Sequence, residues 1–367
     1  MLLCDFMAAL IAAAEKGAKV AKIVRAENTL LQLLVQEKEG KEKNDRFIQD
    51  FKTLADVLIQ EMVRHDLSLK FPGLEENVYG EESNCFTNTD GKSVVVQLCP
   101  TPKETASLLK EVLDGNEKAA TILSETLHEQ VDVSVDEALQ SQQQEVAVED
   151  VGVWIDPIDS TAQFIRGQTG APNNDGIVDE GLQCVTVLIG AFDKQSGQPI
   201  AGVCVQPFAS WDTETQQWLH DKTWSVCYKG VSLSSVKPSS SNKHSIIISS
   251  SESDDVKQKL SRKFTLYSAA GAGYKILSAA WGHVDGYVLS RPTIYKWDCC
   301  APHAVLLSLG GGIVPFTDID LIHGADQLNQ VQYQFSSNEG GNSVPGVIAY
   351  RSKDVLSDII QCFQNGT

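Results

Sequence analysis

Asp156 and Asp159 stand three residues apart where a run of apolar residues ends, and their carboxylates could bind a cation. Pro157 restricts the backbone between them, and two hydroxyl residues, Ser160 and Thr161, follow at the expected start of a helix. Carboxylate oxygens held at a strand end suit a hard cation such as Mg²⁺, and N–H groups at a helix start suit a phosphate. Taken alone, this pattern more often marks a strand, a proline turn and a helix N-cap than a functional site.

Three further groups of acidic residues are informative, although each has a simpler structural explanation. Glu81 and Glu82 follow a short expected strand, where two like charges cost energy unless a cation or solvent neutralises them. Asp298 lies at the expected start of a helix, where simple N-capping would account for it. Asp56 lies in an apolar helix, where it could be a solvated surface carboxylate. The order of these groups along the chain carries more information than any one of them.

In this order, the acidic groups resemble those of the lithium-sensitive, Mg²⁺-dependent phosphomonoesterases. That superfamily includes inositol monophosphatase, inositol polyphosphate 1-phosphatase, bisphosphate 3′-nucleotidase and fructose-1,6-bisphosphatase. Ser160 stands where the monophosphatases usually carry glycine, which favours the inositol polyphosphate 1-phosphatase subfamily. The resemblance covers about residues 45–350, and its longer matching segments are 50–56, 70–74, 80–84, 181–186, 269–275 and 296–298.

The resemblance implies a cofactor of two or three Mg²⁺ ions, with Li⁺ as an inhibitor. It assigns one ion to Glu81, Asp156 and the backbone carbonyl of Ile158, and a second to Asp156, Asp159 and Asp298, with Glu82 beside them. Asp156 would then bridge two ions, as a two-metal displacement at phosphorus requires. Thr161, oriented by Asp56, would align a metal-activated water or take its proton, with no covalent phosphoenzyme.

The resemblance also implies a set of substrate-binding residues: Asp159, Ser160, Thr161, Ser251, Gly271, Ala272, Lys275 and Thr293. The backbone at 271–273 would approach inositol, and the ammonium group of Lys275 would meet a second phosphate. Without the resemblance, Lys275 would be interpreted as an exposed helix lysine beside a glycine-rich cap. The chain departs from the family pattern at Ser253, where a lysine is expected. This departure leaves the preference among inositol polyphosphates open.

The implied reaction is hydrolysis of the 1-phosphate of inositol 1,4-bisphosphate, and of inositol 1,3,4-trisphosphate, in phosphatidylinositol signalling turnover. One alternative is a 3′-phosphoadenosine 5′-phosphate phosphatase, which would share the metal ligands but add an adenine pocket. The matches at 50–56 and 269–275 disfavour it. A second alternative is a non-catalytic protein that binds inositol phosphates or acts as a scaffold. The presence of every implied metal ligand, together with Asp56 and Thr161, disfavours an inactive site.

Helices followed by hairpins make up the expected N-terminal lobe, residues 1–230, an α+β unit that carries most of the metal ligands. Residues 5–36, which are rich in Ala, Leu, Lys and Glu, predict its first helix. A buried strand is expected to end at Asp156, and residues 183–205 predict a β-hairpin. The Gln- and Glu-rich segment 125–150 has no clear period and is expected to be exposed.

Strands and helices alternate in the expected C-terminal lobe, residues 231–367, which begins with a serine-rich stretch and indicates an α/β unit. This lobe would carry Asp298 and the inositol-binding residues. The resemblance implies that the two lobes combine in an α/β fold, a layered αβαβα sandwich of the inositol monophosphatase and fructose-1,6-bisphosphatase type. The N-terminal lobe would hold an antiparallel sheet, the C-terminal lobe a second, mixed sheet, and the metals would lie between them.

The 367-residue chain has 30 Lys and Arg against 48 Asp and Glu, a net charge of −18. This charge argues against nucleic acids and anionic membranes as partners, because their phosphates would be repelled. A small polyphosphate arriving at a metal-loaded pocket stays compatible with it. No apolar run approaches the ~20 residues of a membrane-spanning helix. Nine scattered cysteines without a CxxC pair favour reduced thiols and a cytoplasmic protein, and we expect a monomer, as the subfamily usually is.

Overall fold

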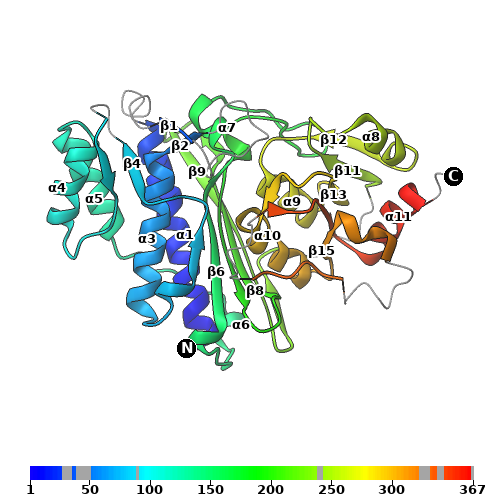
Figure 1. Ribbon diagram of the computed structural model, residues 1–367, viewed down its shortest axis with the longest axis horizontal. Helices are drawn as coiled ribbons and strands as arrows, with labels where there is room; N and C mark the ends of the chain where they lie inside the picture. Colours follow the sequence, from blue (N-terminus) through cyan, green and yellow to red (C-terminus); the bar gives the residue numbers. More distant parts are fainter. Residues whose placement is uncertain are drawn as a thin grey trace.

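A six-stranded β-sheet forms one layer of the fold (Figure 1), and Asp156 and Asp159 lie on one of its strands. The computed structural model describes residues 1–26, 35–38, 51–87, 91–237, 243–321, 331–336 and 343–364. The strands are, in order across the sheet, β10 (Val231–Ser234), β9 (Gln217–Tyr228), β8 (Pro199–Asp212), β7 (Thr186–Asp193), β6 (Val151–Asp159) and β3 (Val78–Gly80). They are antiparallel except at one edge, where β3 lies parallel to β6.

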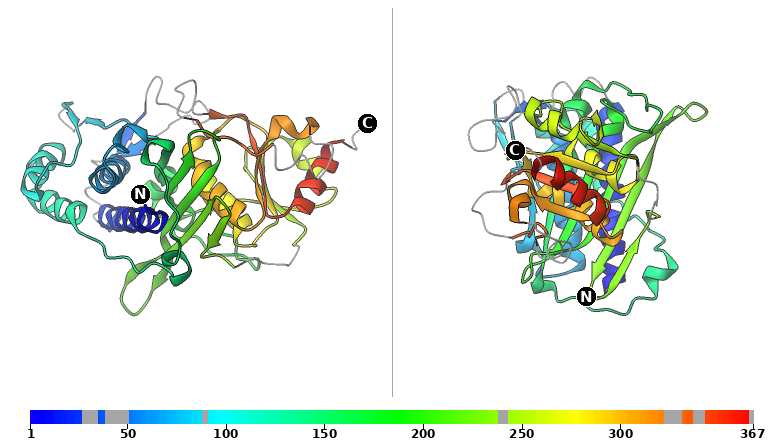
Figure 2. Two further views of the ribbon diagram at one scale, coloured as in Figure 1. Left: turned by 90° about the horizontal axis from the view of Figure 1, so that it is seen from below. Right: turned by 90° about the vertical axis from the view of Figure 1, so that its right-hand side faces the viewer.

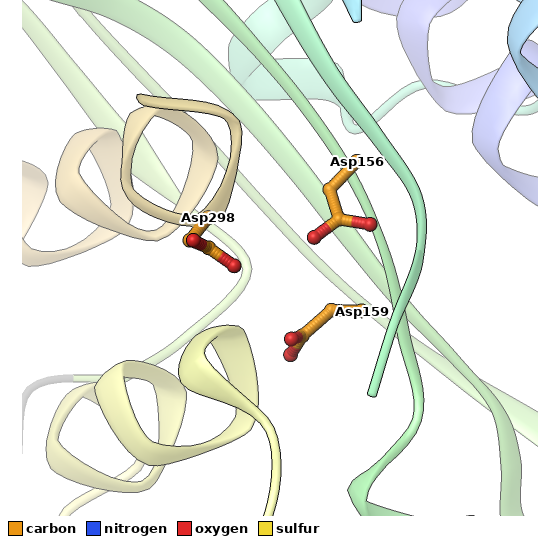
Figure 3. Close-up of side chains that lie close together, drawn as sticks. All are labelled: Asp156, Asp159 and Asp298. Carbon is orange, nitrogen blue, oxygen red and sulfur yellow. The ribbon is translucent and has the colours of Figure 1, made fainter. Parts of the chain in front are cut away.

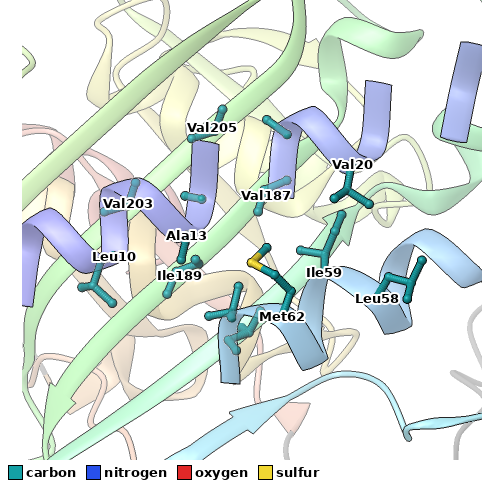
Figure 4. Packing of buried hydrophobic residues seen from close by; sticks show 14 of the residues in the cluster. Leu10, Ala13, Val20, Leu58, Ile59, Met62, Val187, Ile189, Val203 and Val205 are labelled. Atoms are coloured by element: carbon teal, nitrogen blue, oxygen red, sulfur yellow. The ribbon is translucent and has the colours of Figure 1, made fainter. Parts of the chain in front are cut away.

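Helices α1 (Leu3–Ala26) and α3 (Leu54–Lys70) cover one face of this sheet. Their apolar side chains pack against Val187 and Ile189 of β7 and against Val203 of β8, as Figure 4 shows. Helices lie on both faces of the sheet, so β6 and β7 are apolar and buried along nearly their whole length. An outer hairpin of helices α4 (Pro102–Val112) and α5 (Glu117–His128) flanks this layer (Figure 1).

Helix α10 (Lys296–Ser308) packs directly on the opposite face of the sheet because two glycines leave room for it. A Cβ atom at Gly190 would lie 2.4 Å from the backbone nitrogen of Ala301, and one at Gly202 would lie 2.2 Å from the Ala301 carbonyl oxygen. No side chain fits at such distances, so only glycine permits this approach. Asp298 lies one turn before Ala301, and the close packing therefore brings Asp298 to the sheet.

A second, five-stranded sheet lies beyond α10. Its strands are, in order, β12 (Thr265–Ser268), β11 (Ser245–Ile248), β13 (Gly286–Leu289), β17 (Val347–Tyr350) and β15 (Gly312–Pro315). β11 is parallel to both of its neighbours, whereas β17 is antiparallel to both of its own, so this sheet is mixed, as expected.

Helix α9 (Ala272–Ala280) lies with α10 between the two sheets. Helices α8 (Asp254–Leu260) and α11 (Lys353–Gln364) cover the outer face of the second sheet (Figures 1 and 2). The layers therefore alternate helix, sheet, helix, sheet, helix, which confirms the αβαβα sandwich. Short two-stranded pairings complete the described strands: β1 (Val35–Glu37) with β2 (Phe51–Thr53), β4 (Cys85–Thr87) with β5 (Ser93–Val95), and β14 (Ile294–Tyr295) with β16 (Ser343–Val344).

Some boundaries differ from the sequence-based expectation. The first helix was expected over 5–36 but ends at Ala26; residues 35–37 form β1 instead, because pairing with β2 outweighs their helix propensity, and 27–34 lie outside the described residues. The segment 125–150 is largely exposed, as expected, although it begins within α5 and includes the short helix α6 (Glu137–Gln140). No helix in the described ranges is long and apolar enough to cross a membrane.

Candidate active site

Asp156, Asp159 and Asp298 converge between the first sheet and the helices that lie on it (Figure 3). Each offers one carboxylate oxygen, and the three oxygens lie within 4.8 Å of one another. In a regular strand, residues three apart point to opposite faces. The pairing of β6 with β7 shifts register between Asp156 and Asp159, and this irregularity lets both carboxylates face Asp298. Asp298 is held in turn by the backbone N–H of Tyr295, which donates to its Oδ2 at 2.6 Å.

The start of α9 fixes the carboxylate of Asp159. The backbone N–H groups of Ala272 and Gly273 donate to it at 3.1 and 2.9 Å, and the Thr186 hydroxyl donates at 3.2 Å. Gly271 precedes the helix with φ +76°, a conformation that favours glycine. The segment that the resemblance assigns to inositol therefore holds one of the expected metal ligands, through N–H groups pointing at a negative charge.

The electrostatics of the three aspartates favour a bound cation. Burial raises the pKa of Asp156 well above its ordinary value, and the negative charges of Glu81, Asp159 and Asp298 raise it further. Burial and then the charge of Asp159 raise the pKa of Asp298 in the same way. The Oδ1 atom of Asp156 is buried and has no hydrogen-bond partner in the described part of the chain. Buried carboxylates of this kind are costly alone, and their hard oxygen donors fit a divalent cation.

Glu81 and Glu82 follow β3 and share a lysine. The Lys38 ammonium lies 2.5 Å from Glu81 Oε1 and 2.6 Å from Glu82 Oε1. Burial alone would lower the pKa of Lys38, but attraction to the two carboxylates outweighs it and raises that pKa well above its ordinary value. Burial, followed by the charge of Glu81, raises the pKa of Glu82 well above its ordinary value. Sequence reasoning missed Lys38, because it is one of several lysines in the charged stretch 37–45 and nothing local distinguishes it.

Asp56 is fully buried, so the simpler interpretation as a solvated surface carboxylate is wrong. Its Oδ2 accepts hydrogen bonds from the Thr53 backbone N–H at 2.7 Å and the Thr53 hydroxyl at 2.5 Å, which forms a capping box at the start of α3. Burial raises the pKa of Asp56 to about 7, although these bonds from Thr53 oppose the shift. Thr161, the expected partner of Asp56, donates its hydroxyl at 3.0 Å to the carbonyl oxygen of Ile158.

Ser160 adopts a left-handed backbone conformation between Asp159 and the helix α7 (Thr161–Arg166). Its φ and ψ angles are 71° and 46°, and its side chain makes no capping hydrogen bond to that helix. A side chain in this region is strained by about 1 kcal/mol. Such strain often persists at functional sites, where the rest of the fold holds the residue in place.

Lys275 is buried rather than exposed, so its simpler interpretation as a surface lysine is wrong; only 4% of it is accessible to solvent. Its ammonium group donates to the Ala269 carbonyl oxygen at 3.3 Å and lies 5.3 Å from the ring centre of Tyr287. Burial raises the pKa of Asp159 above its ordinary value, and the positive charge of Lys275 partly opposes this shift. Lys275 therefore lies close enough to the aspartates to act on their charge.

Ser251 and Thr293 lie on loops that follow neighbouring strands of the second sheet. Ser251 follows β11 and Thr293 follows β13, and these two strands are parallel, so both loops leave the sheet at the same edge. The buried carboxylate of Glu252 joins the loops, because it accepts from the backbone N–H of Ser290 at 2.9 Å and from the Ser290 hydroxyl at 2.6 Å. A single side chain thus holds the two predicted substrate-binding loops together.

Comparison with known proteins agrees with this geometry. The profile of the inositol monophosphatase family matches residues 90–330. The chain is 41% identical to inositol polyphosphate 1-phosphatase of Mus musculus over 97% of its own length and 96% of that protein, and 40% identical to the Homo sapiens protein of that name with the same coverage. The extragenic suppressor protein suhB of Bartonella henselae shares the fold, with a TM-score of 0.55, at 13% identity over 99% of this chain and all of that one.

Proposed function

The chain belongs to the inositol monophosphatase family of phosphatases, and we propose that it removes the 1-phosphate of inositol 1,4-bisphosphate and inositol 1,3,4-trisphosphate. The convergence of Asp156, Asp159 and Asp298 within 4.8 Å is the observation that carries this proposal. The similarity to inositol polyphosphate 1-phosphatases over nearly the whole chain supports the choice of substrate. We propose Mg²⁺ as the resident cation, with inhibition by Li⁺ and a role in phosphatidylinositol signalling turnover.

One group of site residues would bind the metal ions. Asp156, Asp159 and Asp298 would hold one cation, and Glu81, Asp156 and the Ile158 carbonyl would hold another, with Glu82 beside them. When bound, the cations would activate water and neutralise charge on the departing inositol oxygen. The bonds from α9 to Asp159 keep that carboxylate in position without further rearrangement.

Hydroxyl groups and one lysine would bind the substrate itself. The hydroxyls of Ser160 and Thr161 follow Asp159 directly and would orient the phosphate that is removed. Asp56 and Thr161 would place the attacking water and hold its proton; the raised pKa of Asp56, about 7, suits a group that exchanges a proton near neutral pH. Lys275, beside the aspartates, would meet a second phosphate, with Ser251, Gly271, Ala272 and Thr293 around inositol.

The proposal includes a monomeric protein of the cytoplasm. All nine cysteines are free, which fits a reducing compartment. The monomeric state is supported by the resemblance to its subfamily.

A substrate assay tests the proposed function. The purified protein with Mg²⁺ is given inositol 1,4-bisphosphate, 3′-phosphoadenosine 5′-phosphate or fructose 1,6-bisphosphate, and phosphate release is measured with and without LiCl. We expect rapid release from the inositol substrate, inhibition by LiCl, and inositol 4-phosphate as the product. Asp298→Asn serves as the control for a contaminating phosphatase. If the protein releases no phosphate from inositol 1,4-bisphosphate, the proposed function is wrong; faster release from the nucleotide would assign the adenine-specific alternative.

A further inference from the structure

Lys38 forms ion pairs with both Glu81 and Glu82, and the proposed function assigns Glu81 to a metal ion. Its ammonium group is 2.5 Å from Glu81 Oε1 and 2.6 Å from Glu82 Oε1, and only 3% of the lysine side chain and 1% of the Glu82 side chain are accessible to solvent. We propose that Lys38 is a built-in cation that competes with a divalent metal ion for Glu81 and Glu82, and that it must withdraw before the metal binds there. This inference rests on the proposed function, because that function assigns Glu81 to a metal.

The Lys38 ammonium and a divalent metal ion would compete for Glu81 and Glu82 because of their charge and size. A divalent ion such as Mg²⁺ needs its oxygen ligands at 2.0–2.1 Å and in strict geometry. The ammonium already takes up Glu81 Oε1 at 2.5 Å and Glu82 Oε1 at 2.6 Å, and it repels a second positive charge brought to the same carboxylates. The metal therefore binds only the fraction of molecules in which Lys38 has left, and its apparent dissociation constant rises by the inverse of that fraction.

The position of Lys38 follows from the pairing of two short strands. Lys38 is the residue after β1, and β1 pairs antiparallel with β2, with Gln36 opposite Lys52 and Glu37 opposite Phe51. Strand β2 leads directly into α3, which packs on the first sheet. The β1–β2 pair thus connects the backbone at Lys38 to a rigid element, and only the long side chain has to move for the ammonium to leave.

Lys38 competes with a metal ion at Glu81 and Glu82 but not at the three aspartates. In the described residues, the carboxylates of Asp156, Asp159 and Asp298 have no ion pair with Lys38, and the Oδ1 atom of Asp156 has no hydrogen-bond partner. Removing Lys38 should therefore tighten metal binding at Glu81 and Glu82 far more than at the three aspartates. This tightening of metal binding should also depend on the carboxylate of Glu82.

Metal titration without substrate tests this inference. Mn²⁺, whose free form is visible by electron paramagnetic resonance, is titrated into the metal-free full-length protein and its variants. We expect Lys38→Met to tighten one class of sites by on the order of tenfold, the factor for a lysine docked about 90% of the time. Lys38→Arg keeps the charge and should keep the affinity. Lys16→Met removes a buried lysine of α1 that pairs with Asp66 instead, and should leave Mn²⁺ binding unchanged.

A double-mutant cycle and thermal unfolding complete the test. In a Glu82→Gln background the effect of Lys38→Met should shrink to less than about threefold, since one of the competing carboxylates is gone. Saturating Mn²⁺ should raise the melting temperature of Lys38→Met more than that of the parent chain, because the metal-free variant lacks its internal cation. If Lys38→Met does not fold, Lys38→Gln, which can still donate to a carboxylate, replaces it.

The outcomes separate this inference from the proposed function. Unchanged or weaker Mn²⁺ binding in both Lys38→Met and Lys38→Gln, with normal phosphate release by the parent chain, overturns the competition and leaves the phosphatase assignment intact. No Mn²⁺ binding by any form of the protein overturns both. Tightening in Lys38→Met, lost in the Glu82→Gln background, supports the competition.

Discussion

Gln60 holds the backbone of Glu82 with both ends of its side-chain amide. Its Nε2 donates to the Glu82 carbonyl oxygen at 2.5 Å, and the Glu82 N–H donates to its Oε1 at 2.9 Å. Gln60 is fully buried in α3, and a Cβ atom at Gly80 would lie 1.9 Å from its Oε1, so glycine is needed beside it. Through this pair of bonds, α3 sets the position of the two glutamates.

We predict that Gln60→Leu weakens both the fold and the metal site. The substitution leaves a buried N–H and a buried carbonyl at Glu82 without partners, which costs about 2–3 kcal/mol of unfolding free energy. It also frees the backbone that positions Glu81 and Glu82, so metal affinity should fall by roughly tenfold or more. Urea unfolding measures the first effect, and Mn²⁺ titration of the folded variant measures the second.

Gln183→Leu is the matched control. Gln183 makes the same pair of bonds with Gly170: it accepts from the N–H at 2.9 Å and donates to the carbonyl oxygen at 3.1 Å. This variant should lose stability by a similar mechanism while its Mn²⁺ affinity stays within about twofold of the parent value. An equal loss of affinity in both variants would show that Gln60 acts only through general stability.

Asp156→Asn should make the metal-free protein more stable and the enzyme much slower. Burial and four neighbouring carboxylates raise the pKa of Asp156, so its charge destabilises the folded state. A neutral side chain of the same shape should add about 1 kcal/mol to the free energy of unfolding in EDTA. Phosphate release should fall more than about a hundredfold. Substituting a residue that only hydrogen-bonds a metal ligand can already lower activity by up to about a hundredfold, and Asp156 is proposed as a ligand itself. A variant that is both less stable in EDTA and fully active would contradict this account.

Ser160→Gly should relieve backbone strain. Glycine adopts the left-handed conformation of this position without penalty, so the free energy of unfolding should rise by about 0.5–1 kcal/mol after the added freedom of the unfolded chain is subtracted. If the hydroxyl contacts the phosphate, KM for inositol 1,4-bisphosphate rises at the same time. Gln216→Gly, in the exposed β8–β9 turn at φ 55°, is the control: it should gain stability and leave KM unchanged.

The metal-free protein should lose stability as pH rises from about 4 to about 7. Asp56 has a pKa of about 7 in the folded state against an ordinary value of 3.8, so across this range the unfolded chain is ionised while the folded chain keeps the proton. The folded state binds more protons, and a rise in pH therefore favours unfolding. The raised pKa values of Glu82, Asp156 and Asp298 act in the same direction.

Urea unfolding in EDTA at several pH values checks this dependence. We expect a larger unfolding free energy at pH 5 than at pH 8, and a partial recovery at pH 8 on addition of Mg²⁺, which stabilises the ionised carboxylates. Asp56→Asn removes one of these titrating groups and should make the profile less steep between pH 4 and 7. Stability that increases with pH over this range would refute the raised pKa of Asp56 in the folded state. An unaltered profile in Asp56→Asn would refute it as well.

Local patterns in the sequence were sufficient for much of the fold and for the acidic members of the site. The apolar run before Asp156 predicted a buried strand, and residues 183–205 predicted the hairpin that β7 and β8 form. These signals act over a few residues, because capping, turns and side-chain periodicity depend only on neighbours in the chain. The order of the acidic groups then pointed to the family.

Only the tertiary structure decided how these residues act on one another. Lys38 meets Glu81 across 43 positions of sequence, and Gln60 meets Glu82 across 22; no local pattern singles out either residue. The register shift in β6, the burial of Asp56 and the bonds from α9 to Asp159 likewise depend on which surfaces pack together. The sequence by itself determined which carboxylates are present, whereas packing between distant segments determined their pKa values, their partners and the pairing of Lys38 with Glu81 and Glu82.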